Sequence, residues 1–332
     1  MYLDPKSNPE FHGTTPVRSV LVRRKRHFIF LLLPGANMLD FTAAIEPLRV
    51  CNTLNEEPVY SWSVTSENGA PVVCSNGIAF PVDGKLENTQ PADQIIVCSG
   101  DAGYLDATEQ TLQWLRKHAR FGGAVAGLGT GAFTLARAGL AQDMLTLHWS
   151  HIPVFEEMFP ELECVNDRTV PGKAISFSAG GGSSLDLTLA KIQEDFEDET
   201  AERVAELCLH EYDSNQNRTQ RYPISKRVGS RHPAILNIVK KMEQSIQSPI
   251  ALDDLIDGEN ISKRQVERLF SNYLGTTPSR YYRNLRLDRA RSLLKGTDMS
   301  VLEVSIATGF SSVTNFSKLY RGHFGSRPST DR

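Results

Sequence analysis

A glycine-rich turn in the first half of the chain is the first place where the sequence could do chemistry. Residues 124–128 form an apolar, strand-like run that passes into a helical pattern across residues 129–131. A strand-to-helix elbow of this kind can hold a nucleophile in a strained conformation, with helix N–H groups directed at an oxyanion. Such a turn can equally serve only to let strand and helix pack closely, so on its own it leaves catalysis and packing open.

A second chemistry is indicated near the C-terminus, where two short segments gather cationic, amide and hydroxyl side chains. The first carries Lys263, Arg264, Gln265 and Arg268, and the second carries Ser311, Thr314, Asn315, Lys318 and Arg321. Arg and Lys can donate to guanine edges, Asn and Gln can pair with adenine, and the others can hold phosphates. A recognition helix uses its N-terminal turns, so we expect base contacts from Arg264, Gln265, Arg268, Thr314, Asn315 and Lys318. Taken singly, each could be solvated surface.

Each of these segments belongs to a predicted helix whose other side is apolar. The helices are expected over 263–274, with Ser262 as N-cap, and over 313–324, with Ser312 as N-cap. A short helix and a tight turn precede each one, over 252–261 and 301–311. Apolar side chains at helical spacing would pack inward and leave the polar side free. The pattern predicts two helix-turn-helix units.

A basic helix is predicted between the two units. Residues 279–295 carry an apolar stripe, Leu287, Ala290 and Leu294, and six of them are Arg or Lys. A rigid connector would fix the separation of the two recognition helices, which suits successive major grooves about 34 Å apart.

Together these segments resemble the DNA-binding domain of the AraC/XylS regulator family, over roughly residues 233–330. The resemblance is carried by stretches such as Leu274-Gly275-Thr276-Thr277-Pro278 and Ile306-Ala307-Thr308-Gly309-Phe310. It implies binding to half-sites of double-stranded DNA by a homodimer that activates transcription, with RNA polymerase as a further partner. One departure is the turn at 257–260, which is more acidic and polar than the Ala/Gly-rich turn of the family.

The distribution of charge agrees with a nucleic-acid-binding C-terminus. Residues 1–217 hold 16 Lys/Arg against 29 Asp/Glu, whereas residues 218–332 hold 20 against 10. This contrast indicates an acidic body joined to a module that binds a polyanion. A chance excess of solvated charge is the alternative.

The acidic part alternates short apolar runs with helical patterns, which is typical of a parallel sheet with helical crossovers. Strands are predicted over 28–33, 60–66, 94–98, 123–128 and 174–178, and helices over 38–54, 107–119, 130–138, 152–159, 183–196 and 199–211. The polar run that follows has almost nothing to bury. We therefore expect a tail over 1–26, an α/β domain over 27–211, a linker over 212–231 and an all-α domain over 232–332.

The α/β part resembles the class I glutamine-amidotransferase-like superfamily, in its PfpI-type branch, over roughly 27–211. Leu33-Pro34-Gly35, the elbow and Leu147-His148-Trp149 carry this resemblance, which implies a flavodoxin-like parallel sheet. Enzymes of the superfamily have a cysteine at the elbow and a histidine further on. Here Gly129 takes the place of the cysteine, His148 matches the histidine, and Thr130 would be a poor nucleophile. We expect no catalytic residue and no enzyme activity.

The same resemblance implies a pocket that can still bind a small molecule. Its candidate residues are Asp40, Glu46, Gly100, Gly129, Thr130, Gly131, His148 and Trp149. The glycine-rich backbone could hold a polar group, Asp40 and Glu46 could receive an amine, and Trp149 could offer its ring to a cation. The branch includes regulators of arginine, glycine-betaine and carnitine metabolism, so we expect an amino acid or quaternary amine. His148 and Trp149 as packing residues, and Glu46 as a solvated one, are the alternatives.

The remaining features place the protein in the cytoplasm. The five cysteines, Cys51, Cys74, Cys98, Cys164 and Cys208, form no CxxC pair, so we expect reduced thiols and neither a metal nor a cofactor. No apolar run approaches the roughly 20 residues that span a bilayer. The apolar run after the basic residues 23–26 is short and lacks the cleavage site of a signal peptide.

The sequence therefore favours a ligand-responsive, sequence-specific transcriptional regulator, in which the ligand alters domain or dimer geometry. Two alternatives remain open. One is an amidase- or protease-like enzyme tethered to DNA, against which Gly129 argues. The other is a ligand-independent DNA-binding protein whose N-terminal domain only dimerises.

Overall fold

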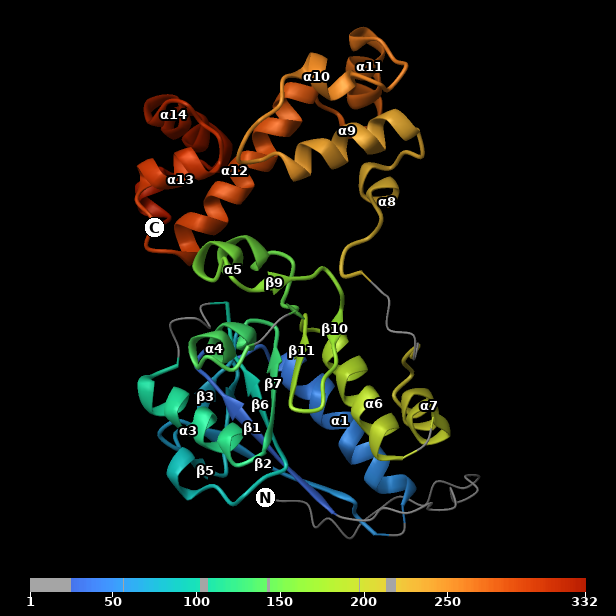
Figure 1. The fold of residues 1–332 in the computed structure, drawn as a ribbon, viewed down its shortest axis with the longest axis vertical. Helices are drawn as coiled ribbons and strands as arrows, with labels where there is room; N and C mark the ends of the chain where they lie inside the picture. The colour runs from blue at the N-terminus through green and yellow to red at the C-terminus, as the bar shows by residue number, and fades with distance from the viewer. Residues whose placement is uncertain (1–24, 56, 102–106, 142–143, 197, 213–218) are drawn as a thin grey trace.

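The computed structural model describes residues 25–55, 57–101, 107–141, 144–196, 198–212 and 219–332, which form two domains stacked along the long axis of the molecule (Figure 1). The predicted tail lies outside these residues except at its end, where Arg26 already belongs to the first strand. No helix among the described residues is long and apolar enough to cross a membrane. All five cysteines are free thiols.

A seven-stranded sheet forms the centre of the N-terminal domain, in the order β10-β11-β7-β6-β1-β2-β5. Its main strands are β1 (Arg26–Leu32), β2 (Tyr60–Ser66), β6 (Gln94–Cys98), β7 (Ala124–Leu128) and β11 (Ile175–Ser178). They pair in parallel, with β1 between β2 and β6. Numbered along the chain, these five have the 2-1-3-4-5 order of flavodoxin-like folds. The predicted fold class is confirmed, and so are all the predicted strands.

Six further strands, each of two residues, occur among the described residues and were not predicted. These are β3 (Val72–Val73), β4 (Ala79–Phe80), β5 (Gly84–Lys85), β8 (Met144–Leu145), β9 (Glu163–Cys164) and β10 (Thr169–Val170). The strand β10 is antiparallel to β11 and ends the main sheet. Two residues are too few to show an alternating pattern, because a strand signal needs about four to eight.

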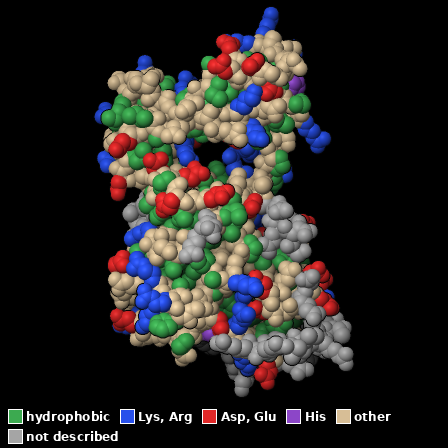
Figure 2. Space-filling view, in the orientation of Figure 1, with side chains coloured by type: hydrophobic (Ala, Val, Ile, Leu, Met, Phe, Trp, Pro, Cys, Tyr) green, Lys and Arg blue, Asp and Glu red, His purple; other side chains and the backbone are tan. Residues whose placement is uncertain are grey.

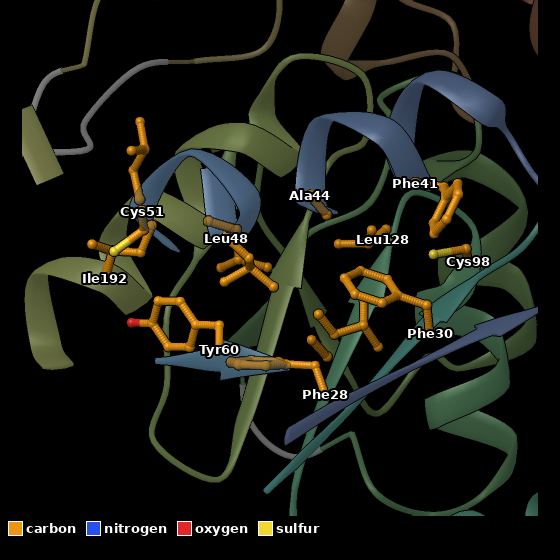
Figure 3. Packing of buried hydrophobic residues seen from close by; sticks show 14 of the residues in the cluster. Phe28, Phe30, Phe41, Ala44, Leu48, Cys51, Tyr60, Cys98, Leu128 and Ile192 are labelled. Atoms are coloured by element: carbon orange, nitrogen blue, oxygen red, sulfur yellow. The ribbon is translucent and has the colours of Figure 1, made fainter. Parts of the chain in front are cut away.

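Helices cover both faces of the sheet (Figure 1). One face packs against α1 (Met38–Leu54), α6 (Ser183–Asp195) and α7 (Asp198–Leu207), and the other against α3 (Glu109–Arg120), α4 (Gly131–Arg137) and α5 (Ile152–Met158). Phe28 and Phe30 of β1 enter the first core and Ile29 the second, because successive strand side chains point to opposite faces. Figure 3 shows the first core, in which Phe30 and Phe41 meet edge to face at 5.5 Å between ring centroids.

The C-terminal domain is helical and has two apolar cores. Its helices are α8 (Ile224–Val228), α9 (Pro233–Gln244), α10 (Leu252–Ile256), α11 (Lys263–Leu274), α12 (Pro278–Gly296), α13 (Val301–Ala307) and α14 (Val313–Phe324), and a short 3-10 turn follows at Pro328–Thr330. Another 3-10 turn, Leu86–Asn88, belongs to the N-terminal domain. Phe270 and Tyr282 lie in the first core, Phe316 and Tyr320 in the second. The long helix α12 contributes to both. Both predicted helix-turn-helix units are present.

The segment predicted as a linker over 212–231 is partly folded. Its second half forms α8, in which Val228 is buried and Ile224 packs against the first helical core. Thr219 and Gln220 instead bond to the N-terminal domain, through Asp167 and Asn166. Ile224 and Val228 are four residues apart, the spacing of one helical face, but the polar residues around them concealed this signal.

Candidate ligand cavity and nucleic-acid interface

A cavity of about 1060 Å³ opens at the carboxyl ends of β1, β6, β7 and β11, and it extends to the C-terminal domain. Figure 2 shows an opening between the two domains. The cavity is lined from below by the loops that follow these strands, from the side by residues 148–151, and from above by residues 219–223 with Ser292, Lys295 and Gly296 of α12. Ligands of open parallel sheets bind at this edge of the sheet.

Asp40 lies at the floor of the cavity, against the elbow. Asn37 caps α1 by accepting from Leu39 N–H at 3.0 Å, and this begins the helix so that Asp40 points inward. One carboxylate oxygen of Asp40, Oδ1, accepts from the Gly181 N–H at 2.6 Å. A Cβ on Gly129 would stand 2.6 Å from the other oxygen, Oδ2. The carboxylate therefore fills the space of a side chain at the elbow.

Burial dominates the electrostatics of this carboxyl group. Asp40 is only 3% exposed, and desolvation raises its pKa to about 6, with the Gly181 N–H opposing the shift and Asp101 adding to it. Arg168, another residue of the cavity wall, pairs with Asp186 at 2.9 Å. No ion pair to Asp40 is found among the described residues. A cationic group from outside would favour the ionised form.

The elbow keeps its backbone shape without presenting a nucleophile. Gly129 has a positive φ of +53°, and α4 begins directly after Thr130. The Thr130 hydroxyl donates to the carbonyl of Gly100 and lies 2.9 Å from the Ser99 hydroxyl. A side chain on Gly131 would meet the carbonyl of Val97, so this glycine permits close packing of helix and strand.

His148 and Trp149 lie on the cavity wall, and both are exposed. The His148 Nδ1 is 2.7 Å from the Ser150 hydroxyl, and Trp149 is 42% exposed. Trp149 already faces a cation, because the guanidinium carbon of Arg221 lies 4.6 Å from its ring centroid. Sequence reasoning did not identify Arg221, since it falls in a polar run that predicted a linker.

The segment 219–223, which we call the strap, is tied to the N-terminal domain by Gln220. Its side-chain amide donates to the Leu147 carbonyl at 2.8 Å and the Asp167 carbonyl at 3.1 Å. Its side-chain oxygen accepts from the Trp149 N–H at 2.7 Å. These bonds hold Arg221 over the cavity.

The structure does not bring Glu46 to the cavity, contrary to the prediction. Glu46 is exposed on α1 and pairs with Arg49 at 2.6 Å. It follows Asp40 by six residues, and six residues of a helix with 3.6 residues per turn lead to a different side. Gly131 was also predicted to line the cavity and does not, because it packs against the Val97 carbonyl instead. The predicted residues that do line the cavity are Asp40, Gly100, Gly129, Thr130, His148 and Trp149.

The C-terminal domain rests on α5 (Figure 1), and Val154 of α5 also lines the cavity. Arg289 of α12 pairs with Glu156 of α5 at 3.3 Å. At the end of α12, a Cβ on Gly296 would stand 2.6 Å from a methyl carbon of Val154. Glycine at this position therefore lets the two helices approach.

The predicted DNA-contacting side chains on α11 and α14, and Ser311 just before α14, are all exposed. On the other sides of these helices, Val266, Phe270, Phe316 and Tyr320 are buried. Gln265 also has a local role. It completes a capping box, because its side-chain oxygen accepts from the Ser262 N–H at 2.8 Å.

The unusual acidic turn of the first unit is held by a neighbouring helix. Glu259 pairs with Lys241 of α9 at 3.0 Å, and Gly258 and Asn260 take positive φ angles. The acidic residue thus stabilises the turn rather than disturbing the packing of the unit.

Comparison with known proteins assigns both domains. Residues 256–332 match the family described as a helix-turn-helix domain, and residues 26–194 match the DJ-1/PfpI family. The chain is 38% identical over 307 residues to the HTH-type transcriptional regulator CdhR of Pseudomonas aeruginosa, covering 92% of this chain and 91% of CdhR. It is 36% identical over 304 residues to the HTH-type transcriptional regulator GbdR of the same species, covering 91% and 83%.

A solved structure shares the fold of the N-terminal domain. The structure of an AraC family transcriptional regulator from Pseudomonas putida aligns with a TM-score of 0.50 and 23% identity, and it covers 55% of this chain and 99% of that one.

Proposed function

The chain belongs to the family of AraC-type, DNA-binding transcriptional regulators with an N-terminal DJ-1/PfpI domain, and from this premise we propose that its cavity binds a cationic small molecule that controls DNA binding. The observation that carries the proposal is Asp40, a buried carboxyl group without a cationic partner among the described residues. Trp149, which is 42% exposed, adds an aromatic ring to the wall of the same cavity. An amino acid or a quaternary amine combines a charge for the carboxylate with a surface for the ring.

The cavity binds its ligand without transforming it. Gly129 brings no reactive side chain to the elbow, and the carboxylate of Asp40 takes the space that a nucleophile would need. Thr130 is the neighbouring hydroxyl, and it donates to the Gly100 carbonyl. A hydroxyl nucleophile requires an adjacent base to take its proton, and the Thr130 hydroxyl donates to the Gly100 carbonyl instead. The DNA-tethered enzyme is therefore disfavoured.

The C-terminal domain reads double-stranded DNA through α11 and α14. The exposed cationic and amide side chains of both helices support this, since major-groove recognition needs such donors. We assign the sensor to residues 26–212 and the DNA-binding domain to residues 224–332, joined by the strap and the residues before it. The protein acts in the cytoplasm as a homodimer that activates transcription through contact with RNA polymerase.

Thermal unfolding of the full-length protein with amino acids, betaines and polyamines tests the proposed ligand class. A true ligand stabilises saturably, by about 2.7 kcal/mol at a hundred times Kd. Asp40→Asn should abolish the stabilisation, while Glu46→Gln, an exposed carboxylate on the same helix, should preserve it. Saturable stabilisation by none of these compounds would favour a purely dimerising N-terminal domain. An unchanged Kd in Asp40→Asn would refute the role of Asp40.

A further inference from the structure

The strap places a cation of the protein itself on the aromatic face of the cavity. The Arg221 guanidinium carbon lies 4.6 Å from the ring centroid of Trp149, within the range of a cation–π contact. Both residues line the cavity that also holds Asp40. A ring face that carries one cation has no room for a second on the same side, so Arg221 stands where a free cation would gain most.

Arg221 has little else to hold it in place. Its nearest ion-pair partner among the described residues is Glu243 of α9, at 3.9 Å. That carboxylate is already engaged by Arg227, which donates to its two oxygens at 2.7 and 3.1 Å. A pair at 3.9 Å with a shared carboxylate contributes little. The Trp149 contact is therefore the main close interaction of the Arg221 charge.

The neighbouring contacts of the strap are independent of this charge. Gln220 bonds to main-chain groups of the N-terminal domain through its own amide. On the other side, Pro223 leads directly into α8, whose Val228 is buried in the C-terminal domain. Arg221 therefore lies in the short segment between Gln220, which is bonded to the N-terminal domain, and α8, which is packed in the C-terminal domain. A movement of Arg221 would alter the connection between the two domains.

We propose that Arg221 is a tethered occupant of the cation subsite on Trp149, and that a free ligand bearing a guanidinium or quaternary ammonium group displaces it. This inference rests on the proposed function, because it assumes that the cavity takes a cationic ligand. When Arg221 is displaced from Trp149, the strap residues after Gln220 lose their contact with the N-terminal domain, and the connection to α8 loosens. The ligand therefore acts on the position of the DNA-binding domain by removing a contact, and Trp149 exchanges one cation for another.

Calorimetric titration of the full-length protein tests the competition, with choline, glycine betaine and arginine as probes and a neutral tert-butyl isostere of choline as the probe control. Arg221→Ala removes the competitor, so a cationic probe should bind about 2- to 30-fold more tightly, the range expected for one cation–π contact. Arg227→Ala is the matched control, since Arg227 also pairs with Glu243. In a Trp149→Ala background the effect of Arg221→Ala should vanish.

Trypsin supplies a second measurement that does not depend on affinity. It cleaves after arginine, so a saturating cationic probe should speed cleavage after Arg221 several-fold, while cleavage after Arg203 on α7 should keep its rate. The neutral isostere should have no effect. Mass spectrometry of the products identifies each cut.

The outcomes separate this inference from the proposed function. If a cationic probe binds the wild type but Arg221→Ala binds it equally or more weakly, or cleavage after Arg221 does not accelerate, the competition is wrong while the ligand cavity stands. If none of the cationic probes binds the wild type or Arg221→Ala, the proposed ligand class is wrong and the competition falls with it. Tighter binding in Arg227→Ala equal to that in Arg221→Ala would also overturn the competition, because Arg227 does not contact Trp149.

Discussion

The carboxylate of Asp40 occupies the space into which a side chain on Gly129 would project, because a Cβ on Gly129 would stand 2.6 Å from Oδ2 of Asp40. The two residues lie 89 positions apart in sequence, and the fold brings them together because α1 and the elbow both start at the carboxyl edge of the sheet. The elbow of a DJ-1/PfpI domain has thus become the wall of a carboxylate pocket.

Substitution at Gly129 should reveal this shared space. Gly129→Ala must displace Asp40 as well as strain a positive φ, which costs about 1–2 kcal/mol by itself. Gly139→Ala is the matched control, because Gly139 has a φ of +66° with nothing within 4 Å of its Cβ. Urea unfolding should show a larger loss of stability for Gly129→Ala. Equal losses would mean that Asp40 moves aside freely.

Gly129→Cys should gain no amidase activity, because the Asp40 carboxylate occupies the space that the cysteine side chain would need.

The buried carboxyl group predicts a pH dependence of stability. The pKa of Asp40 is raised from 3.8 to about 6 in the folded protein, so the folded state holds a proton that the unfolded state has released. Its contribution is complete below pH 4 and is lost as the pH rises through 6, by up to about 3 kcal/mol. Asp40→Asn should lack this loss. The free energies of unfolding of the wild type and Asp40→Asn, measured between pH 4 and 8, test this loss. If the difference between the two proteins stayed constant with pH, the prediction would be contradicted.

Ligand affinity should have the opposite pH dependence. A cationic ligand needs the ionised carboxylate, so its Kd should rise about tenfold for each pH unit below 6. Calorimetric titration with glycine betaine between pH 5 and 8 measures the change, because the quaternary ammonium group of this compound does not titrate. Glu46→Gln should leave the profile unchanged, since Glu46 lies on a different side of α1. A flat profile would exclude Asp40 as the counter-ion.

Removal of recognition side chains should weaken specific DNA binding. Arg268→Ala or Lys318→Ala should each cost about 1–3 kcal/mol if the side chain contacts a base. Gel-shift titrations on the upstream region of the gene should also show log affinity falling with log salt, by about 0.9 per neutralised phosphate. Arg203→Ala on α7 is a charge-matched control outside the DNA-binding domain. A purified protein that binds all sequences equally at moderate salt would refute sequence-specific recognition.

Gln265 offers a way to separate recognition from helix capping. Gln265→Glu retains an oxygen that can accept from the Ser262 N–H, so the capping box persists, but the amide donor is lost. Gln265→Ala loses both and should also destabilise the domain by about 1 kcal/mol. If Gln265 reads adenine, both variants should bind DNA more weakly, and only Gln265→Ala should unfold earlier. Wild-type affinity in Gln265→Glu would restrict this residue to capping.

The contact between the domains should depend on Gly296. Gly296→Ala places a methyl group 2.6 Å from a methyl carbon of Val154 and should push α12 away from α5, at a cost of about 1–3 kcal/mol. Small-angle scattering should detect the change in domain arrangement. Val154→Ala in the same protein makes room and should restore the arrangement. A wild-type scattering profile for Gly296→Ala alone would show that the contact is not tight.

Sequence patterns were sufficient for the central strands and for the two helix-turn-helix units with their connecting helix, but α9 was not among the predicted helices. The strands β2 and β6, for example, are continuous apolar or alternating runs, and α11 and α14 show both an apolar side and a capping serine. Spacing along a helix could also have excluded Glu46, because six residues separate it from Asp40. The position of Asp40 beside Gly129 depends instead on the order of the strands in the sheet. A local sequence pattern cannot predict which loops meet at the carboxyl edge of the sheet.

The strap shows a different limit. Gln220 and Arg221 lie among polar residues, and polar composition is the usual sign of a linker. Their interactions are with Trp149 and with main-chain carbonyls of distant segments. Such contacts leave no periodic trace in the sequence, because a single extended segment binds through individual side chains.

The helix α12 determines how any signal from the sensor can be expressed. It belongs to the cores of both helix-turn-helix units, and its last turn touches α5. A shift of α5 must therefore carry the two reading helices together as one rigid body, and their mutual spacing stays constant. The sensor can therefore change only the orientation of the DNA-binding domain as a whole, and in the homodimer that we propose this would alter the distance between the reading helices of the two protomers.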